Sequence, residues 1–255
     1  MHYETKEIME LACKAGKIVL ENGGEIYRVE QTMTSVCAAY GLNGYESFAT
    51  PTIIILSASD AKGEPHSRMM RITTRSINLD KIASVNDFSR KLPIEIGEAL
   101  TELTRIEEST PYPNWVRVLV SGIGVGAFAV IFGGGFRDII GGLFLGALIR
   151  MVVFALQKKR AGDFMVNLVG GGSAALGGWL INQINPMTDH WVITVSAMML
   201  LVPGLLFTNA MRDIAAGDLV SGSSRGIEVL SIAAALACGA AAVYAVLSLV
   251  GGGLP

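Results

Sequence analysis

Five charged residues gather in a short stretch that lies between two long apolar segments. The stretch runs from Pro203 to Glu228, and its charged members are Arg212, Asp213, Asp218, Arg225 and Glu228. Charged side chains this close to hydrocarbon are expensive, so they commonly mark an ion or substrate pathway. The planar fork of arginine matches both oxygens of a carboxylate. We therefore predict a carboxylate site that uses Arg225 first and Arg212 second. Asp213, Asp218 and Glu228 are predicted to couple protons or to orient the arginines.

Two pairs of small or helix-breaking residues lie in the same stretch. Pro203-Gly204 falls inside an apolar segment, where proline removes one helical hydrogen bond. This predicts either an interrupted helix of the kind that carriers use for binding or an ordinary helix end. Ser221-Gly222 would allow the backbone to approach a bound molecule.

The charges also permit a plainer interpretation, in which they form a solvated loop. Glu228 fits this interpretation less well, because it lies one turn into the last apolar segment. Arg225 precedes it by three residues, on the same face of a helix. The two side chains could neutralise each other or bind a carboxylate and a proton in turn.

Arg137-Asp138 form a second charged pair, after the glycine-rich run 133–135. They predict either a short external turn with a local ion pair or an outer contact for a transported molecule.

The charge distribution divides the chain near residue 112. Residues 1–112 contain 12 Lys/Arg and 16 Asp/Glu, whereas the remainder contains 8 and 6. Half of all residues are apolar (51%). We therefore predict a small cytoplasmic α+β domain over 1–112 and a transmembrane domain over 113–255.

The polar part has alternating helix and strand patterns. Apolar residues at helical spacing predict helices over 4–21 and 25–40. The β-branched run 48–57 predicts one strand, and 66–75 predicts its return strand. Two further helices are expected over 79–91 and 94–108, which gives the order α-α-β-β-α-α. We interpret this domain as an accessory unit with solvated charged faces.

Five apolar segments follow and predict five transmembrane helices. They cover residues 115–133, 139–156, 164–184, 190–207 and 227–249. Small residues four apart, as in Gly122/Gly126 and Gly142/Gly146, predict close helix packing in lipid. The glycines of 122–126 lack the strand and the Lys-Ser/Thr of a phosphate loop, so we assign them to packing.

Positive charge sets the expected orientation. Lys158, Lys159 and Arg160 place the loop between the second and third segments in the cytoplasm. The N-terminus is then cytoplasmic and the C-terminus outside. The net charge of −2 gives no nucleic-acid footprint, and the three scattered cysteines show no metal spacing. We expect no metal, no cofactor and no cleaved signal peptide.

Several motifs together resemble the threonine/serine exporter family of bacterial membrane proteins. They are GGEIYRVEQTM, FATPTIII, RITTRSINLDKIASVNDFSRKL and PGLLFTNAMRDIAAGDLVSGSSRGIE, and the resemblance covers nearly the whole chain. It implies a plasma-membrane exporter that is not an enzyme. Full-length members look like a cytoplasmic domain followed by about ten spans, so this chain resembles the larger subunit of a split form. That form is associated with small carboxylates such as succinate, and the single-chain form with threonine and serine.

The resemblance also implies a short polytopic partner subunit. A second five-span unit would have inverted topology, and carriers commonly place their site between inverted repeats; a homo-oligomer could also supply the second wall. Two other function classes stay open from the residues alone: a membrane-anchored enzyme or sensor that acts through its cytoplasmic domain, and a passive channel.

Overall fold

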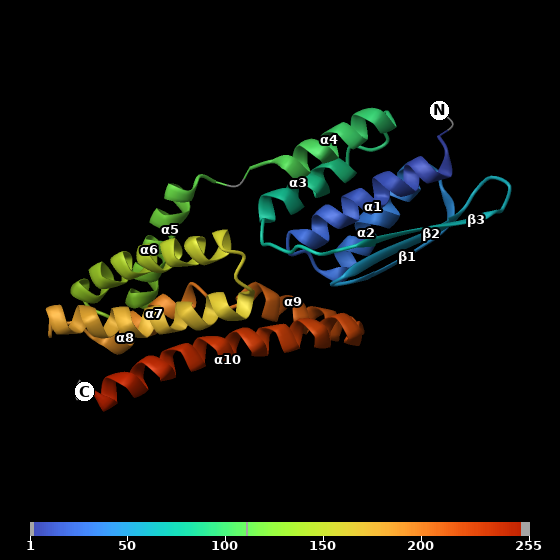
Figure 1. The fold of residues 1–255 in the computed structure, drawn as a ribbon. Helices are drawn as coiled ribbons and strands as arrows, with labels where there is room; N and C mark the ends of the chain where they lie inside the picture. Colours follow the sequence, from blue (N-terminus) through green and yellow to red (C-terminus); the bar gives the residue numbers. More distant parts are fainter. Residues whose placement is uncertain (1–2, 111, 251–255) are drawn as a thin grey trace. The chain divides into compact units, whose positions relative to one another are not determined.

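The chain is mostly helical and divides into two compact units. The computed structural model describes residues 3–110 and 112–250 (Figure 1). The first unit contains the described residues of Met1–Pro111 together with Leu205–Gly226, and the second contains Tyr112–Gly204 and the chain from Ile227. The charged stretch therefore belongs, for most of its length, to the same unit as the N-terminal residues.

The first unit is built around a central helix, α1 (Thr5–Glu21). α1 packs against α2 (Ile26–Ala39), against strands β2 (Ile53–Ser59) and β3 (Pro65–Arg71), and against α3 (Leu79–Ser89) and α4 (Ile96–Glu108). Figure 1 shows α1 between the sheet and the α3–α4 pair. Leu11, Ala15 and Ile18 are completely buried, because this helix has neighbours on both sides. The four helices predicted in this part of the sequence are confirmed.

The sheet has three antiparallel strands in the order β1-β2-β3, with β1 at Asn43–Thr50. The prediction of one strand over 48–57 is wrong, because a turn at Pro51-Thr52 separates β1 from β2 and pairs Thr50 with Ile53. Proline fixes φ at the value that the second position of a turn requires. The return strand is confirmed as β3 and pairs with β2 along its whole length.

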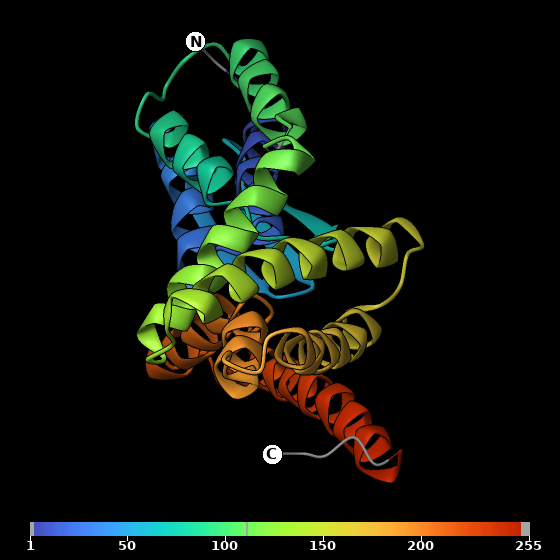
Figure 2. The ribbon, with the colours of Figure 1, turned by 90° about the vertical axis from the view of Figure 1, so that its left-hand side faces the viewer.

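The second unit contains α5 (Asn114–Ile131), α6 (Phe136–Lys158), α7 (Asp163–Ile184), α8 (His190–Met199) and the later part of α10 (Leu219–Leu249). In Figure 2, α6 returns across α5 after the short turn that joins them. Their crossing depends on the predicted glycines. A Cβ on Gly122 would lie 2.6 Å from the carbonyl oxygen of Leu143, and one on Gly146 would lie 2.7 Å from that of Ser121. Only glycine allows this approach.

Four helices are long and apolar enough to cross a membrane: α5, α6, α7 and α10. A fifth span is present if α8 and α9 (Gly204–Ala215) are counted together as one bent pair. The predicted span over 190–207 is therefore not one continuous helix. α8 ends at Met199, before Pro203, and a new helix begins at Gly204. These features are those of a polytopic membrane protein.

Candidate functional site

The turn between α1 and α2 presents main-chain groups to the charged stretch. Gly23 has φ +93°, in the left-handed region that favours glycine. A side chain on Gly24 would lie 2.9 Å from the carbonyl oxygen of Val19, so this position also requires glycine. The turn leaves the carbonyls of Gly23 and Gly24 available, and the first N–H groups of α2 point out of its N-terminus.

Two helices carry the other side of the site. α9 ends at Ala215, and after Gly217, with φ +90°, α10 begins at Leu219. The carboxylate of Asp218 accepts the N–H of Ser221 at 3.1 Å and so caps the start of α10. A Cβ on Gly222 would lie 3.0 Å from the carbonyl oxygen of Ala210, so α9 and α10 pack closely here. Gly222 thus serves helix packing, and both Ser221 and Gly222 are helical.

A buried ion pair joins the two helices. Arg225 Nη1 lies 3.0 Å from Asp213 Oδ2, and the two side chains are 4% and 1% exposed. Arg225 Nη2 also donates to the carbonyl oxygen of Gly24 at 2.8 Å, and Asp213 Oδ1 accepts the N–H of Ile26 at 3.4 Å. The carboxylate therefore lies at the positive N-terminus of α2. The solvated-loop interpretation is wrong for these two residues.

Two further polar side chains lie one helical turn from this pair. Asn209 precedes Asp213 by four residues on α9, and Ser221 precedes Arg225 by four residues on α10, so each shares a face with its charged neighbour. Asn209 Nδ2 donates to the carbonyl oxygen of Gly23 at 2.9 Å. Among the described residues, Asn209 Oδ1 and Ser221 Oγ have no hydrogen-bond partner although both are buried. We call Asn209, Asp213, Ser221 and Arg225 the polar seam.

The second predicted arginine lies beside the seam. Arg212 Nη1 contacts Glu25 Oε1 at 2.5 Å, and the Glu25 side chain is only 10% exposed. Arg28 Nε lies 3.2 Å from the other oxygen of Glu25. Glu25 is thus shared by two arginines, so the expectation of solvated charged faces in the first unit is wrong for this residue.

The remaining residues of the charged stretch occupy different places. Pro203 lies in the break before α9, and Gly204 begins α9. Glu228 is half-buried on α10, in the part of that helix that belongs to the second unit. The roles predicted for these residues stay predictions.

Arg137 and Asp138 lie in the first turn of α6. Asp138 is buried and accepts the N–H of Gly135 at 2.8 Å and that of Asp189 at 2.7 Å. It therefore ties the start of α6 to the residue that caps α8. Arg137 is exposed, and its guanidinium contacts Met187 Sδ.

The structure adds two polar positions that the sequence reasoning did not select as site residues. Arg150 Nε donates to Ser121 Oγ at 2.8 Å. The Arg150 guanidinium lies 5.9 Å from the ring centre of Phe154, and the Arg117 guanidinium lies 4.7 Å from the same ring centre. His190 is 4% exposed at the start of α8. Both lie in apolar segments, where ionisable residues are rare, and that rarity is the signal that could have identified them.

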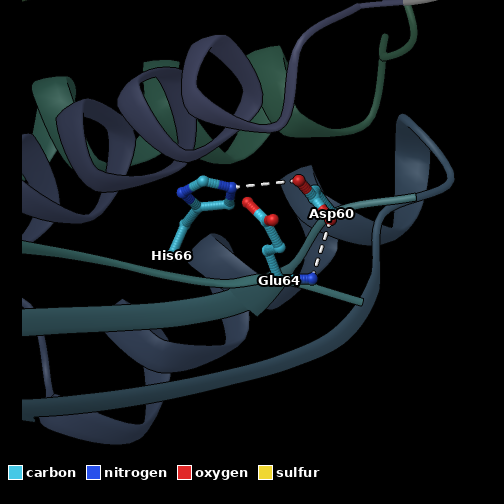
Figure 3. Close-up of side chains that lie close together, drawn as sticks. All are labelled: Asp60, Glu64 and His66. Carbon is cyan, nitrogen blue, oxygen red and sulfur yellow. Dashed lines mark hydrogen bonds and ion pairs between the residues drawn. The ribbon is translucent and has the colours of Figure 1, made fainter. Parts of the chain in front are cut away.

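The described residues contain one group with the donor types of a metal site, in the turn between β2 and β3. Ligand atoms of Asp60, Glu64 and His66 lie within 4.8 Å of one another (Figure 3). Asp60 is already engaged by the hairpin: Oδ1 accepts the N–H groups of Lys62 and Glu64, and Oδ2 lies 3.3 Å from His66 Nε2. The N–H of Glu64, together with His66 and Lys62, lowers the pKa of Asp60. These contacts explain the cluster as a stabilised turn.

Comparison with known proteins places the chain in a family. The family model described as "Putative threonine/serine exporter" matches residues 10–247. The chain belongs to the threonine/serine exporter family. Its relatives in this family include a "Threonine/serine exporter" of Corynebacterium glutamicum, 25% identical over 250 residues that cover 93% of this chain and 51% of that protein. The chain thus spans about half the length of this relative.

Two other relatives have a length closer to that of this chain. The "Probable succinate transporter subunit YjjP" of Klebsiella aerogenes is 21% identical over 226 residues, which cover 87% of each chain. The Escherichia coli K12 protein of the same name is 20% identical over 87% of this chain and 88% of its own. No solved structure matches.

Family membership and the apolar helices identify a multi-pass protein of the bacterial plasma membrane, and they favour a transporter over the membrane-anchored enzyme or sensor.

Proposed function

We propose that the chain is one subunit of a secondary transporter that exports a small carboxylate or a hydroxy amino acid, with succinate and threonine/serine as the candidate substrates. The family supports export, and the relatives named as transporter subunits support a partner chain. A short polytopic protein is the partner we expect, because the chain spans half of the single-chain relative. In this proposal the first 112 residues are cytoplasmic and the C-terminus lies outside.

The polar seam is the proposed entrance site, and one observation carries this assignment. A buried ion pair, Asp213–Arg225, is flanked by two buried polar atoms that lack partners among the described residues, Asn209 Oδ1 and Ser221 Oγ. Nearly all buried polar groups in proteins are hydrogen-bonded, and those without partners require an explanation. A polar substrate supplies that explanation, because its hydroxyl, amino or carboxyl groups can complete the missing bonds.

Substrate binding at the seam requires an exchange of partners. In the structure, the Arg225 guanidinium is occupied by the Asp213 carboxylate and by the carbonyl oxygen of Gly24. A substrate carboxylate would replace the neutral carbonyl and form the stronger, charge-assisted bond. Asp213 and Glu228 are the proposed proton-coupling groups. Asp218 supports the site because it caps the start of α10, and Gly222 supports it because it allows α9 and α10 to pack closely. Arg212 supports the site through its ion pair with Glu25 in the α1–α2 turn.

The test compares two serines of α10 that differ in burial. Ser221 Oγ is buried and lacks a partner among the described residues, whereas Ser223 is exposed and its Oγ donates to the carbonyl oxygen of Val220 at 3.2 Å. We expect Ser221→Ala to slow efflux at least tenfold, since a lost hydrogen bond to a charged group costs about 1.5–3 kcal/mol. We expect Ser223→Ala to have no effect on efflux.

Efflux is measured from proteoliposomes that contain the chain with and without its partner, loaded with labelled succinate, threonine or serine. Ser221→Ala should not lower thermal stability, because it removes a buried group that lacks a partner. Normal efflux from a stable Ser221→Ala protein would contradict the assignment of the seam. Efflux of none of the three substrates by the chain with its partner would contradict the proposed function itself.

A further inference from the structure

A second polar site lies in the first unit, in a cavity between α2 and α3. Its volume is about 450 Å³, within the range of small-molecule sites. Val19 and Ile82 are its aliphatic lining residues, and the other lining side chains are polar. Arg28 and Gln31 come from α2, and Asn86 and Arg90 come from α3 and its C-cap. A cavity with this lining suits a charged, hydrogen-bonding ligand.

The two arginines come from opposite ends of their helices, Arg28 from the first turn of α2 and Arg90 from the C-cap of α3. The N–H of Asn78, the N-cap of α3, donates at 3.1 Å to the carbonyl oxygen of Asn22, which ends α1, so α3 starts close to the turn that leads into α2. Figure 1 shows both helices running in the same sense from there. Arg28 lies near the common start, and Arg90 follows Ile82 by eight residues, or about 12 Å along the helix. Two long arginine side chains can reach inward from these ends.

The charge of the lining is positive. Arg28 and Arg90 are cationic, and none of the described residues that line the cavity is acidic. Neutral groups between them, such as the side-chain amides of Gln31 and Asn86, can donate further hydrogen bonds. A ligand that matches this arrangement has an anionic group at each end and a short chain between them.

From this geometry we propose that the cavity binds a small dicarboxylate, with one carboxylate at Arg28 and the other at Arg90. Guanidinium groups recognise carboxylates through paired hydrogen bonds. Two arginines from separate helices favour a ligand with two anionic groups over a single compact anion such as phosphate. The site is separate from the polar seam, since the two share no residue.

Glu25 links this cavity to the entrance site, and this part of the inference rests on the proposed function. Glu25 contacts Arg28 at 3.2 Å and Arg212 at 2.5 Å. A dicarboxylate that binds Arg28 competes with Glu25 for the same guanidinium. Ligand binding therefore leaves Glu25 to Arg212, which lies on α9, one of the two helices that carry the seam. The dicarboxylate site thus senses cytoplasmic anions and acts on the entrance through one shared carboxylate.

The experiment is titration calorimetry of the full chain in detergent micelles, with succinate as the probe. Succinamide, which has the same length without charge, and inorganic phosphate are the comparison ligands. We expect Arg90→Gln to weaken succinate binding at least tenfold, as for the loss of one charge-assisted hydrogen bond. Arg71→Gln is the matched control, because Arg71 is exposed on β3 and does not line the cavity.

A second variant should act in the opposite direction. Glu25→Gln removes the competitor of the ligand, so we expect tighter succinate binding, a result that damage to the fold would not produce. Hydrogen exchange should show protection of residues 26–39 and 79–90 on addition of succinate, and Ser221→Ala should keep the component of succinate binding that Arg90→Gln loses.

Three results would overturn the proposal. They are equal affinity for succinamide or phosphate, unchanged affinity in Arg90→Gln, and weaker binding in Glu25→Gln. Loss of binding in Ser221→Ala but not in Arg90→Gln would place succinate in the polar seam, which would overturn this site and leave the proposed function intact.

Discussion

The Asp213–Arg225 pair should show strong thermodynamic coupling when its members are neutralised in turn. The two side chains are 1% and 4% exposed and lie 3.0 Å apart. Removal of one partner leaves an uncompensated buried charge, which costs about 3–5 kcal/mol. Arg225→Gln and Asp213→Asn should each destabilise the first unit by this amount.

The corresponding fall in Tm can be estimated from the size of the unit. At roughly 3–4 °C per kcal/mol for a unit of between 100 and 150 residues, each single variant should lose about 9–20 °C. The measurement is the fraction of protein that stays monodisperse in detergent after heating. The double variant Arg225→Gln/Asp213→Asn leaves no unpaired charge, so it should be more stable than either single variant.

Efflux separates stability from function in this cycle. The double variant regains stability but lacks the guanidinium that we assign to the substrate carboxylate, so it should still export nothing above background. Additive losses of stability would refute the reasoning about the buried pair. A stable double variant with normal efflux would refute the role of Arg225.

Two further predictions concern packing and thiol chemistry. A Cβ on Gly239 of α10 would lie against the carbonyl oxygen of Leu168 on α7, so Gly239→Ala should destabilise the second unit by about 1–3 kcal/mol in a thermal assay. Gly124→Ala is the control: a Cβ at Gly124 would have no neighbouring atom within 4 Å among the described residues, so this variant should be neutral in the same assay. Burial raises the pKa of Cys13 to about 11 and that of Cys37 to about 12. Both thiols should therefore resist maleimide at pH 7.5 in the folded chain and react in denaturant, in contrast to the exposed Cys238. Rapid labelling of Cys13 or Cys37 in the folded protein would contradict their burial.

Local patterns explain which parts of the fold could be predicted. The helices of the first unit follow from apolar periodicity, and the close α5–α6 crossing follows from glycines four residues apart. The sequence predicts only the end of β1, because this strand, NGYESFAT, contains turn residues at one end and few apolar ones. Pro51 lies within a continuous β-rich run, and only the pairing of Thr50 with Ile53 shows that the run forms two strands.

The candidate site could be predicted in its residue types but not in its contacts. Arg225 and Asp213 stand out in the sequence because they lie near apolar segments. Their other partners, Gly24 and Ile26, are about 200 residues away along the chain and contribute main-chain groups, which leave no side-chain signal. Sequence spacing does not single out Glu25, since it does not show that Arg212, 187 residues away along the chain, reaches it.

The contacts of the α1–α2 turn explain how several charges remain in a stretch that borders apolar helices. Each buried charge has a partner of opposite sign or a main-chain dipole: Asp213 has Arg225 and the N-terminus of α2, and Arg225 also has the Gly24 carbonyl. These partners offset the free-energy cost of burying the two charges. They could also be replaced by polar groups of a bound molecule. Because the carbonyl of Gly24 is neutral, it binds Arg225 more weakly than the Asp213 carboxylate does, and in the proposed function an incoming carboxylate would replace it first. Displacement of that carbonyl would loosen the turn from α10, and the same turn carries Glu25, which contacts Arg28 of the proposed dicarboxylate cavity. Substrate entry and anion sensing would then act on one short segment, Gly23–Ile26, so variants in that turn should alter both succinate binding and efflux even though they lie far from the seam in the sequence.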